Sequence, residues 1–281
     1  MTDFTPQEQT LNAADKTPIF LRHWPVSDPK AVLIVCHGLG EYGGRYGNVV
    51  ERLVPAGYAI FAHDHRGHGR SGGRRGHVDR FDQFLDDAYM VVMLAQETYP
   101  DKKVYMLGHS MGGLIALAYA LRHGDTLDGV VSSSAALELA VKVLVVKEAL
   151  GTVMASIWPT LALSNGLDPK DLSHDESVVK AYIDDPLVHD RVTARFYQEF
   201  TGAMSRTING AGALQLPLLM WHGKADAIVA WEGTKKVYDR AAGSDKKLEL
   251  FDGLFHEVLN EIGKEQALDL LHQWLDQHVE Q

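Results

Sequence analysis

A glycine-rich hexapeptide, residues 108–113 (Gly-His-Ser-Met-Gly-Gly), constrains the fold of this chain more than any other stretch. The apolar run at 104–107 predicts a buried parallel strand, and 114–121 is rich in helix formers and long enough for several turns. The hexapeptide then lies at a sharp strand-to-helix turn, where the glycines on either side of Ser110 let strand and helix approach closely. Such a turn exposes the Ser110 hydroxyl beside the free N–H groups of a helix N-terminus. An ordinary glycine-rich turn is the alternative.

The size and charge of the chain exclude several classes of protein. Its 281 residues suffice for one large α/β domain with an insertion or for two small domains. The 27 basic and 37 acidic side chains leave a net charge of −10, which argues against nucleic acid as a partner and against recruitment to anionic membranes. The single cysteine, Cys36, is expected in the core. Because we find no secretory signal and no long uncharged apolar run, we expect a cytoplasmic protein.

Strand-like and helix-like segments alternate along most of the chain. After a polar, frayed stretch at 1–10, strands are expected at 11–14, 19–24, 31–36, 58–62, 104–107, 129–133, 216–222 and 247–251. Helices are expected at 48–56, 81–98, 114–121, 232–241 and 262–278. The first two strands form an antiparallel edge. The alternation predicts an α/β fold with a mostly parallel central sheet of about eight strands flanked by helices.

The alternation stops after the sixth strand. Between about 134 and 210 we expect no strand, only helices and loops, and an insertion of roughly seventy residues is too large for a simple loop. We therefore expect one domain over residues 1–281 with a helical insertion. The first part of the insertion, 137–158, is apolar almost all round, unlike a surface helix. Its outer side would contact a lipid surface or be covered by a second copy of the chain in a homodimer.

Two residues further along the chain are expected to act with Ser110. A serine hydroxyl becomes a good nucleophile when a base removes its proton and a third group orients that base. Where a serine lies at such a turn, the acid and the histidine follow in that order, each in a loop after a strand. Asp226 lies just beyond the penultimate predicted strand and His256 just beyond the last. Asp252 and Glu257 are competing acids, but both are too near His256 in sequence to reach its far nitrogen comfortably. We expect Ser110, Asp226 and His256 to form a catalytic triad.

Two backbone N–H groups are expected to stabilise the negative charge that develops on a substrate oxygen. One belongs to Met111, next to the serine, and the other to Leu39 in the loop after the 31–36 strand. Gly38 and Gly40 would let this loop fold toward Ser110. A plain tight turn is the alternative reading of these glycines, and an oxyanion hole requires a tight turn here in any case.

The 14 histidines also suggest a metal site. His63, His65 and His68 lie close together, but they lack a carboxylate or histidine partner at metal-ligand spacing elsewhere. A hydrogen-bonded loop is the better interpretation, so we expect no metal and no cofactor.

Short motifs are spread over nearly the whole chain. They are His-Gly-Leu-Gly-Glu at 37–41 with Gly-Arg-Tyr at 44–46, Asp-His-Arg-Gly-His-Gly-Arg-Ser at 64–71, Gly-His-Ser-Met-Gly-Gly at 108–113, Asp-Pro-Leu at 185–187, His-Gly-x-x-Asp at 222–226 and the loop of His256. Together they resemble the monoacylglycerol lipase and lysophospholipase branch of the α/β-hydrolase fold, which is also grouped with the serine aminopeptidases. The first two motifs are more specific than the hexapeptide.

The resemblance implies that residues 134–210 form a cap over the active site, with an apolar channel for an acyl chain. It also implies a small polar pocket for a glycerol end, to which Glu41 and Arg45 contribute; an ion pair that holds the loop rigid is their alternative role. The candidate substrate-binding residues are Gly38, Glu41, Arg45 and His109. The chain departs from the family at Leu259, where some relatives carry a second histidine, so no polar contact to glycerol is expected there.

The expected function is that of a serine ester hydrolase, which cleaves monoacylglycerols or similar single-chain lipid esters through an acyl-enzyme. A broad carboxylesterase for short or aromatic esters is the alternative, followed by a lysophospholipase and an aminopeptidase. A binding protein that keeps the fold without turnover is an alternative of a different class. The expected partners are the small lipid ester substrate and, through the insertion, a lipid surface or a second copy of the chain.

Overall fold

The computed structural model describes residues 4–140 and 155–280. The strands are β1 (Gln7–Asn12), β2 (Pro18–Trp24), β3 (Ala31–Cys36), β4 (Tyr58–His63), β5 (Val104–His109), β6 (Gly129–Ser133), β7 (Ala162–Ser164), β8 (Arg191–Thr193), β9 (Leu218–Gly223) and β10 (Lys246–Phe251). The α-helices are α1 (Gly47–Leu53), α2 (Asp82–Thr98), α3 (Met111–His123), α5 (Glu176–Asp184), α6 (Ala194–Gly210), α7 (Trp231–Arg240) and α8 (Glu265–Val279).

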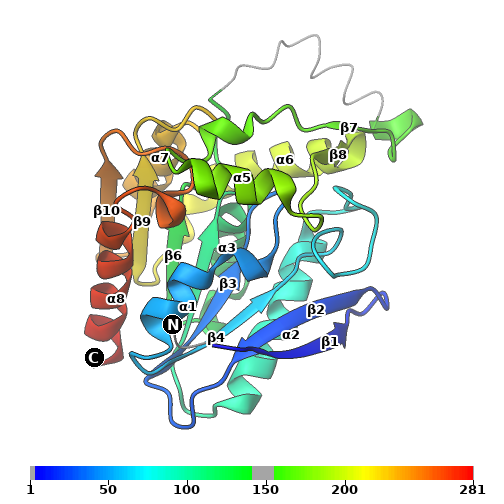
Figure 1. The fold of residues 1–281 in the computed structure, drawn as a ribbon. Coiled ribbons are helices and arrows are strands. Elements are labelled where there is room, and N and C mark those ends of the chain that lie inside the picture. Colours follow the sequence, from blue (N-terminus) through cyan, green and yellow to red (C-terminus); the bar gives the residue numbers. More distant parts are fainter. Residues whose placement is uncertain (1–3, 141–154, 281) are drawn as a thin grey trace.

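The central sheet is mostly parallel, as the sequence predicts (Figure 1). It has eight strands in the order β1-β2-β4-β3-β5-β6-β9-β10. β1 and β2 pair antiparallel, as do β2 and β4, and all the other neighbours pair in parallel. The parallel strands therefore end at one edge of the sheet, where the loops that follow them meet.

The first strand corrects one prediction. Residues 1–10 are not all frayed, because β1 begins at Gln7 and pairs with β2 along its whole length, from Gln7 opposite His23 to Asn12 opposite Pro18. The side chains of β1 are almost all exposed. An edge strand that water reaches on both faces needs no alternation of apolar and polar residues, so its sequence carries no strand signal.

Helices cover both faces of the sheet (Figure 1). Alternate side chains of β3 point to opposite sides. Val32 and Ile34 lie in a core that includes α2 and α3, whereas Leu33 and Val35 lie in a core that includes α1 and α8. A strand buried on both faces needs a continuous apolar run, which explains why β3 is recognisable in the sequence. In the described part of the chain, no helix is both long enough and apolar enough to span a bilayer.

Between β6 and β9 the chain leaves the sheet and forms α5, α6 and a separate ribbon of β7 and β8 (Figure 1). The prediction that 134–210 holds no strand is therefore wrong. Ala162 pairs with Thr193 and Ser164 with Arg191, in strands of three residues each. Strands this short are held by their backbone ladder and show no period of two in the sequence. Of the apolar stretch predicted at 137–158, residues 141–154 lie outside the described residues.

Candidate active site

Ser110 occupies the turn between β5 and α3. Its φ of 55° and ψ of −118° lie in a region that residues other than glycine rarely adopt. Two glycines make the turn possible: a Cβ at Gly108 would lie 2.1 Å from the carbonyl oxygen of Gly112, and a Cβ at Gly112 would lie 2.0 Å from that of Cys36. The predicted sharp turn between a strand and a helix is present, and backbone strain is concentrated at its serine.

His256 lies in the loop after β10, and its Nδ1 is 2.7 Å from Asp226 Oδ2. Because a carboxylate only accepts, Nδ1 donates the proton and Nε2 keeps its lone pair. Among the described residues that Nε2 has no hydrogen-bond partner. The His256 ring is buried against the ring of His109, with centroids 4.8 Å apart, so it lies beside the residue that precedes Ser110. Burial alone would lower the pKa of His256, but the facing Asp226 carboxylate raises it.

Asp226, in the loop after β9, is held on both of its oxygens. Oδ1 accepts the backbone N–H groups of Ile228 and Val229 at 2.8 and 2.9 Å. Oδ2 accepts from His256 and, at 3.0 Å, from His222 Nε2. Burial alone would raise the pKa of Asp226, but the charge of His256 and the hydrogen bonds from both imidazoles hold that pKa well below its usual range. The side chain is therefore a fixed carboxylate.

His222, at the end of β9, was not predicted to belong to the site. Its second nitrogen, Nδ1, is 2.7 Å from Thr234 Oγ1 on α7, and both side chains are fully buried. The His-Gly-x-x-Asp motif at 222–226 contains the signal, because a short turn after a strand brings its first and last side chains together.

The two competing acids are engaged elsewhere. The Asp252 side chain is 85% exposed, and one of its oxygens lies 2.6 Å from Lys224 Nζ. Glu257 is buried and receives two hydrogen bonds from Arg45, at 2.6 and 2.9 Å. Asp226 is thus the carboxylate that the structure places against His256.

The loop after β3 lies against the turn that carries Ser110. A Cβ at Gly38 would lie 3.3 Å from Ser110 Cβ, so this glycine is directly beside the serine. Gly40 has a φ of 80°, a conformation that glycine adopts without strain, and it turns the chain after Leu39. Met111 begins α3, where a backbone N–H has no acceptor within the helix. Of the two predicted N–H donors, Met111 directly follows the serine in the chain, and Leu39 directly follows Gly38.

Glu41 and Arg45 form the ion pair that is one of the two roles predicted for them. Arg45 Nη1 lies 2.5 Å from Glu41 Oε2 and 2.6 Å from Glu257 Oε1. The other oxygen of Glu41 accepts the Gly38 N–H at 2.6 Å and the Tyr46 hydroxyl at 2.9 Å. This buried network joins the loop after β3 to the loop that carries His256.

Buried histidines gather beneath the loop after β3. Donor atoms of Cys36, His63 and His65 all lie within 4.8 Å of one another, so Cys36 joins the histidines grouped from the sequence. The expected hydrogen bonds of the loop are present only in part: His68 Nδ1 lies 3.0 Å from the Arg66 carbonyl oxygen, whereas neither ring nitrogen of His63 has a hydrogen-bond partner among the described residues. Burial lowers the pKa of His63 to about 4 and raises that of the Cys36 thiol to about 12.

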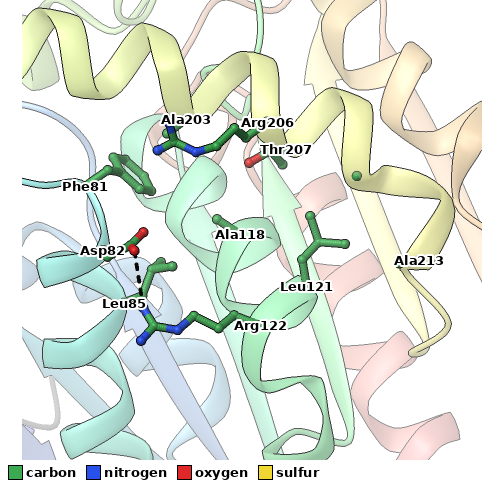
Figure 2. A pocket seen from close by; sticks show the side chains of 11 residues that line it. Phe81, Asp82, Leu85, Ala118, Leu121, Arg122, Ala203, Arg206, Thr207 and Ala213 are labelled. Carbon is green, nitrogen blue, oxygen red and sulfur yellow. Dashed lines mark ion pairs between the residues drawn. The ribbon is translucent and has the colours of Figure 1, made fainter.

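Two cavities differ in their relation to this site. One of about 360 Å³ lies between α2, α3 and α6, and Figure 2 shows Asp82 and Arg122 at its side, 3.8 Å apart. The other, of about 280 Å³, lies within the insertion and is lined by five apolar side chains together with Asn165, Tyr182, His189 and Asp190. No triad residue lines either cavity. The backbone N–H of His189 donates to the Gly40 carbonyl at 2.9 Å, so the second cavity adjoins the loop after β3.

The chain is similar to known proteins over nearly its whole length. The sequence profile of the family described as Serine aminopeptidase, S33 matches residues 27–263. The monoacylglycerol lipase of Mycolicibacterium smegmatis is 34% identical over 99% of this chain and 100% of its own length. The human monoglyceride lipase is 34% identical over 89% of this chain and 83% of its own length. The crystal structure of Paleococcus ferrophilus monoacylglycerol lipase is 33% identical, has a TM-score of 0.84, and covers 97% of this chain and 99% of its own.

The sheet order, the serine at the strand-to-helix turn and these similarities define the class of protein: the chain is an α/β-hydrolase. Within that class it belongs to the serine aminopeptidase S33 family, whose profile covers most of its length.

Proposed function

We propose that the chain is a serine ester hydrolase that cleaves monoacylglycerols or similar single-chain lipid esters to a fatty acid and an alcohol. The observation that supports this proposal is the hydrogen bond between Asp226 and His256. The His256 ring lies against the ring of His109, the residue that precedes the strained Ser110. The similarity to monoacylglycerol lipases over nearly the full chain supports the choice of substrate.

In the proposed reaction, His256 Nε2 takes the proton of Ser110 while the serine oxygen attacks the ester carbonyl carbon. Asp226 holds the imidazole with its proton on Nδ1 and stabilises the imidazolium that forms. His256 then gives its proton to the leaving alcohol, which departs and leaves the acyl group on Ser110. A water molecule, deprotonated by the same nitrogen, then attacks the acyl carbon. The bond between that carbon and Ser110 breaks, the fatty acid leaves, and His256 returns the proton to the serine oxygen.

The negative charge on the substrate oxygen is assigned to the N–H groups of Leu39 and Met111. Each such donor is worth about 3 kcal/mol in the transition state of acyl transfer. The Gly38 N–H is not free for this task, because it donates to Glu41 at 2.6 Å. Glu41 therefore holds the loop in a conformation in which the Leu39 N–H can donate to the substrate oxygen.

We assign residues 134–210 as a cap within a single domain of residues 1–281. The cavity inside this insertion supports its role as part of the acyl channel, because its lining is mostly apolar and it adjoins Gly40. We assign Arg45 to the alcohol end of the substrate, together with Gly38, Glu41 and His109. The Arg45 guanidinium is already paired with the carboxylates of Glu41 and Glu257. A substrate hydroxyl would therefore bind to this ion-pair network and not to an unpaired cation.

The exposed apolar side chains of the cap support contact with a lipid surface. Ile157 is 74% exposed, Trp158 57% and Leu163 65%. With a net charge of −10, such contact depends on buried apolar area rather than on anionic headgroups. A homodimer that covers these residues is the competing proposal. We propose a cytoplasmic location, which is compatible with both the lipid contact and the homodimer. The free, buried Cys36 is consistent with this location.

The function is tested by labelling with a fluorophosphonate probe and by hydrolysis of monoacylglycerols of graded chain length beside p-nitrophenyl esters. We expect one label per chain on Ser110 and a preference for monoacylglycerols. A folded chain that resists the probe would refute the enzyme proposal. Labelling together with a preference for short p-nitrophenyl esters would favour the broad carboxylesterase.

The lipid contact is tested by replacing Trp158 and Leu163 together with glutamate and measuring sedimentation with neutral phosphatidylcholine vesicles. Binding should fall on the order of tenfold, because two charges replace apolar area in the interface, while hydrolysis of a soluble short-chain ester stays unchanged. Met93→Glu, at a 41% exposed apolar side chain on α2, is the matched control. If vesicle binding is unaffected and a dimer dissociates instead, the surface is a subunit interface.

A further inference from the structure

The Asp226 carboxylate has an imidazole on each side of one oxygen. His256 Nδ1 and His222 Nε2 lie 2.7 and 3.0 Å from Oδ2, while the backbone occupies Oδ1. His222 is fully buried, and the reaction proposed above makes no use of it. The hydrogen bond from this buried histidine to Asp226 is therefore not explained by the proposed reaction.

The hydrogen bonds around His222 define where its proton lies. Asp226 Oδ2 can only accept, so His222 Nε2 carries a proton, which also points at the Val229 carbonyl oxygen at 3.2 Å. In the neutral ring Nδ1 is then an acceptor, and the Thr234 hydroxyl donates to it at 2.7 Å. The tautomer of His222 is held from both ends by the buried side chains of Asp226 and Thr234.

We propose that His222, held by Thr234, is a positioning residue that keeps Asp226 Oδ2 aimed at His256. This inference rests on the proposed function, because it assigns a second support to the same triad. The backbone donors on Oδ1 fix only one end of the carboxylate, and rotation about the bond to Cγ can still swing Oδ2 away from His256. The His222 N–H restrains that rotation and supplies the second donor that a buried carboxylate oxygen requires.

The inference predicts how catalysis changes when the His222 N–H is lost. Without it, Asp226 is less well oriented, the imidazolium of His256 is less stabilised, and the acidic limb of the kcat/KM profile moves to lower pH. The other charged or titratable groups that act on His256 are Glu257, Glu41 and His109. None of these is bonded to His222 in the described residues, so the expected movement comes through Asp226.

The experiment compares His222→Ala with His222→Gln, whose side-chain amide keeps an N–H donor, and Thr234→Val with Thr234→Ser, which keeps the hydroxyl. We expect His222→Ala to lower kcat for p-nitrophenyl butyrate about 10- to 100-fold with little change in KM, as for a lost hydrogen bond to a charged group. His222→Gln should recover most of the loss. Thr234→Val should show a smaller loss in the same direction, and Thr234→Ser should be close to wild type.

Titration with a fluorophosphonate counts the competent sites, so rates refer to folded enzyme. If His222→Ala lowers only the thermal midpoint, while kcat per titrated site stays within twofold and the acidic limb does not move, the role is structural packing and the inference is wrong. An acidic limb that moves to higher pH would also overturn it, since His256 would then be better stabilised without His222. A wild-type chain that the probe does not label refutes the proposed function instead.

If His222→Ala does not fold, the threonine pair decides the same question. Equal kcat values and equal pH profiles for Thr234→Val and Thr234→Ser would overturn the inference, because the hydroxyl would then have no effect on Asp226.

Discussion

Replacing Asp226 with asparagine produces a conflict that can be worked out atom by atom. Both oxygens of the carboxylate accept: Oδ1 from the backbone N–H groups of Ile228 and Val229, and Oδ2 from His256 and His222. An asparagine amide has one acceptor oxygen and one NH₂ donor. Whichever way it is turned, its NH₂ meets two N–H groups. The backbone donors cannot change, so the amide oxygen stays with them and the NH₂ faces the two imidazoles.

His256 escapes this conflict by moving its proton from Nδ1 to Nε2, which is then unable to accept the proton of Ser110. We expect kcat for p-nitrophenyl butyrate to fall about 10⁴-fold, equivalent to about 5 kcal/mol. Asp252→Asn is the matched control, because that side chain is 85% exposed and should lose little activity. A loss below tenfold in Asp226→Asn, or an equal loss in Asp252→Asn, would refute the assignment of the acid.

Three further predictions concern the serine, the turn and the buried histidines. Ser110→Ala should lose about 10⁴- to 10⁶-fold in kcat with an unchanged thermal midpoint, and a variant that keeps a tenth of the rate would place the nucleophile elsewhere. Gly112→Ala sets a Cβ 2.0 Å from the Cys36 carbonyl and should lower the free energy of unfolding in urea by about 1–3 kcal/mol; an unchanged urea midpoint would contradict this. Burial lowers the pKa of His63 to about 4 and that of His68 to about 3, so between pH 6.5 and 4 these two side chains bind more protons in the unfolded chain than in the folded one. The free energy of unfolding should therefore decrease as the pH is lowered through this window, by up to about 1.4 kcal/mol per pH unit for each histidine. Urea midpoints that do not change between pH 6.5 and 4 would contradict this prediction.

The parts of the fold that are predictable from the sequence are those with local causes. The turn at Ser110 is predictable because strand, glycine and helix signals adjoin, and β3 because both of its faces are buried. Asp226 and His256 are predictable because each follows a strand in the required order. Their hydrogen bond, across thirty positions of the chain, is a consequence of that order rather than of any local pattern.

The features of the site that cannot be predicted from the sequence depend on contacts between segments far apart in the chain. Arg45 reaches Glu257 across 212 positions, and nothing near either residue distinguishes this pairing from the local Glu41–Arg45 pair. His222 belongs to a motif that is visible in the sequence, but its role becomes apparent only when its two nitrogens can be assigned to Asp226 and Thr234.

The two outermost strands bear on how copies of this chain can meet. β1 carries Gln7, Glu8 and Gln9 on an exposed edge, and at the far end of the sheet β10 presents Lys247 and Glu249 (Figure 1). Polar and charged side chains on an outer strand oppose the backbone pairing by which sheets of separate molecules fuse into a larger sheet. We therefore expect self-association of this hydrolase to use surfaces other than the two outer edges of its sheet.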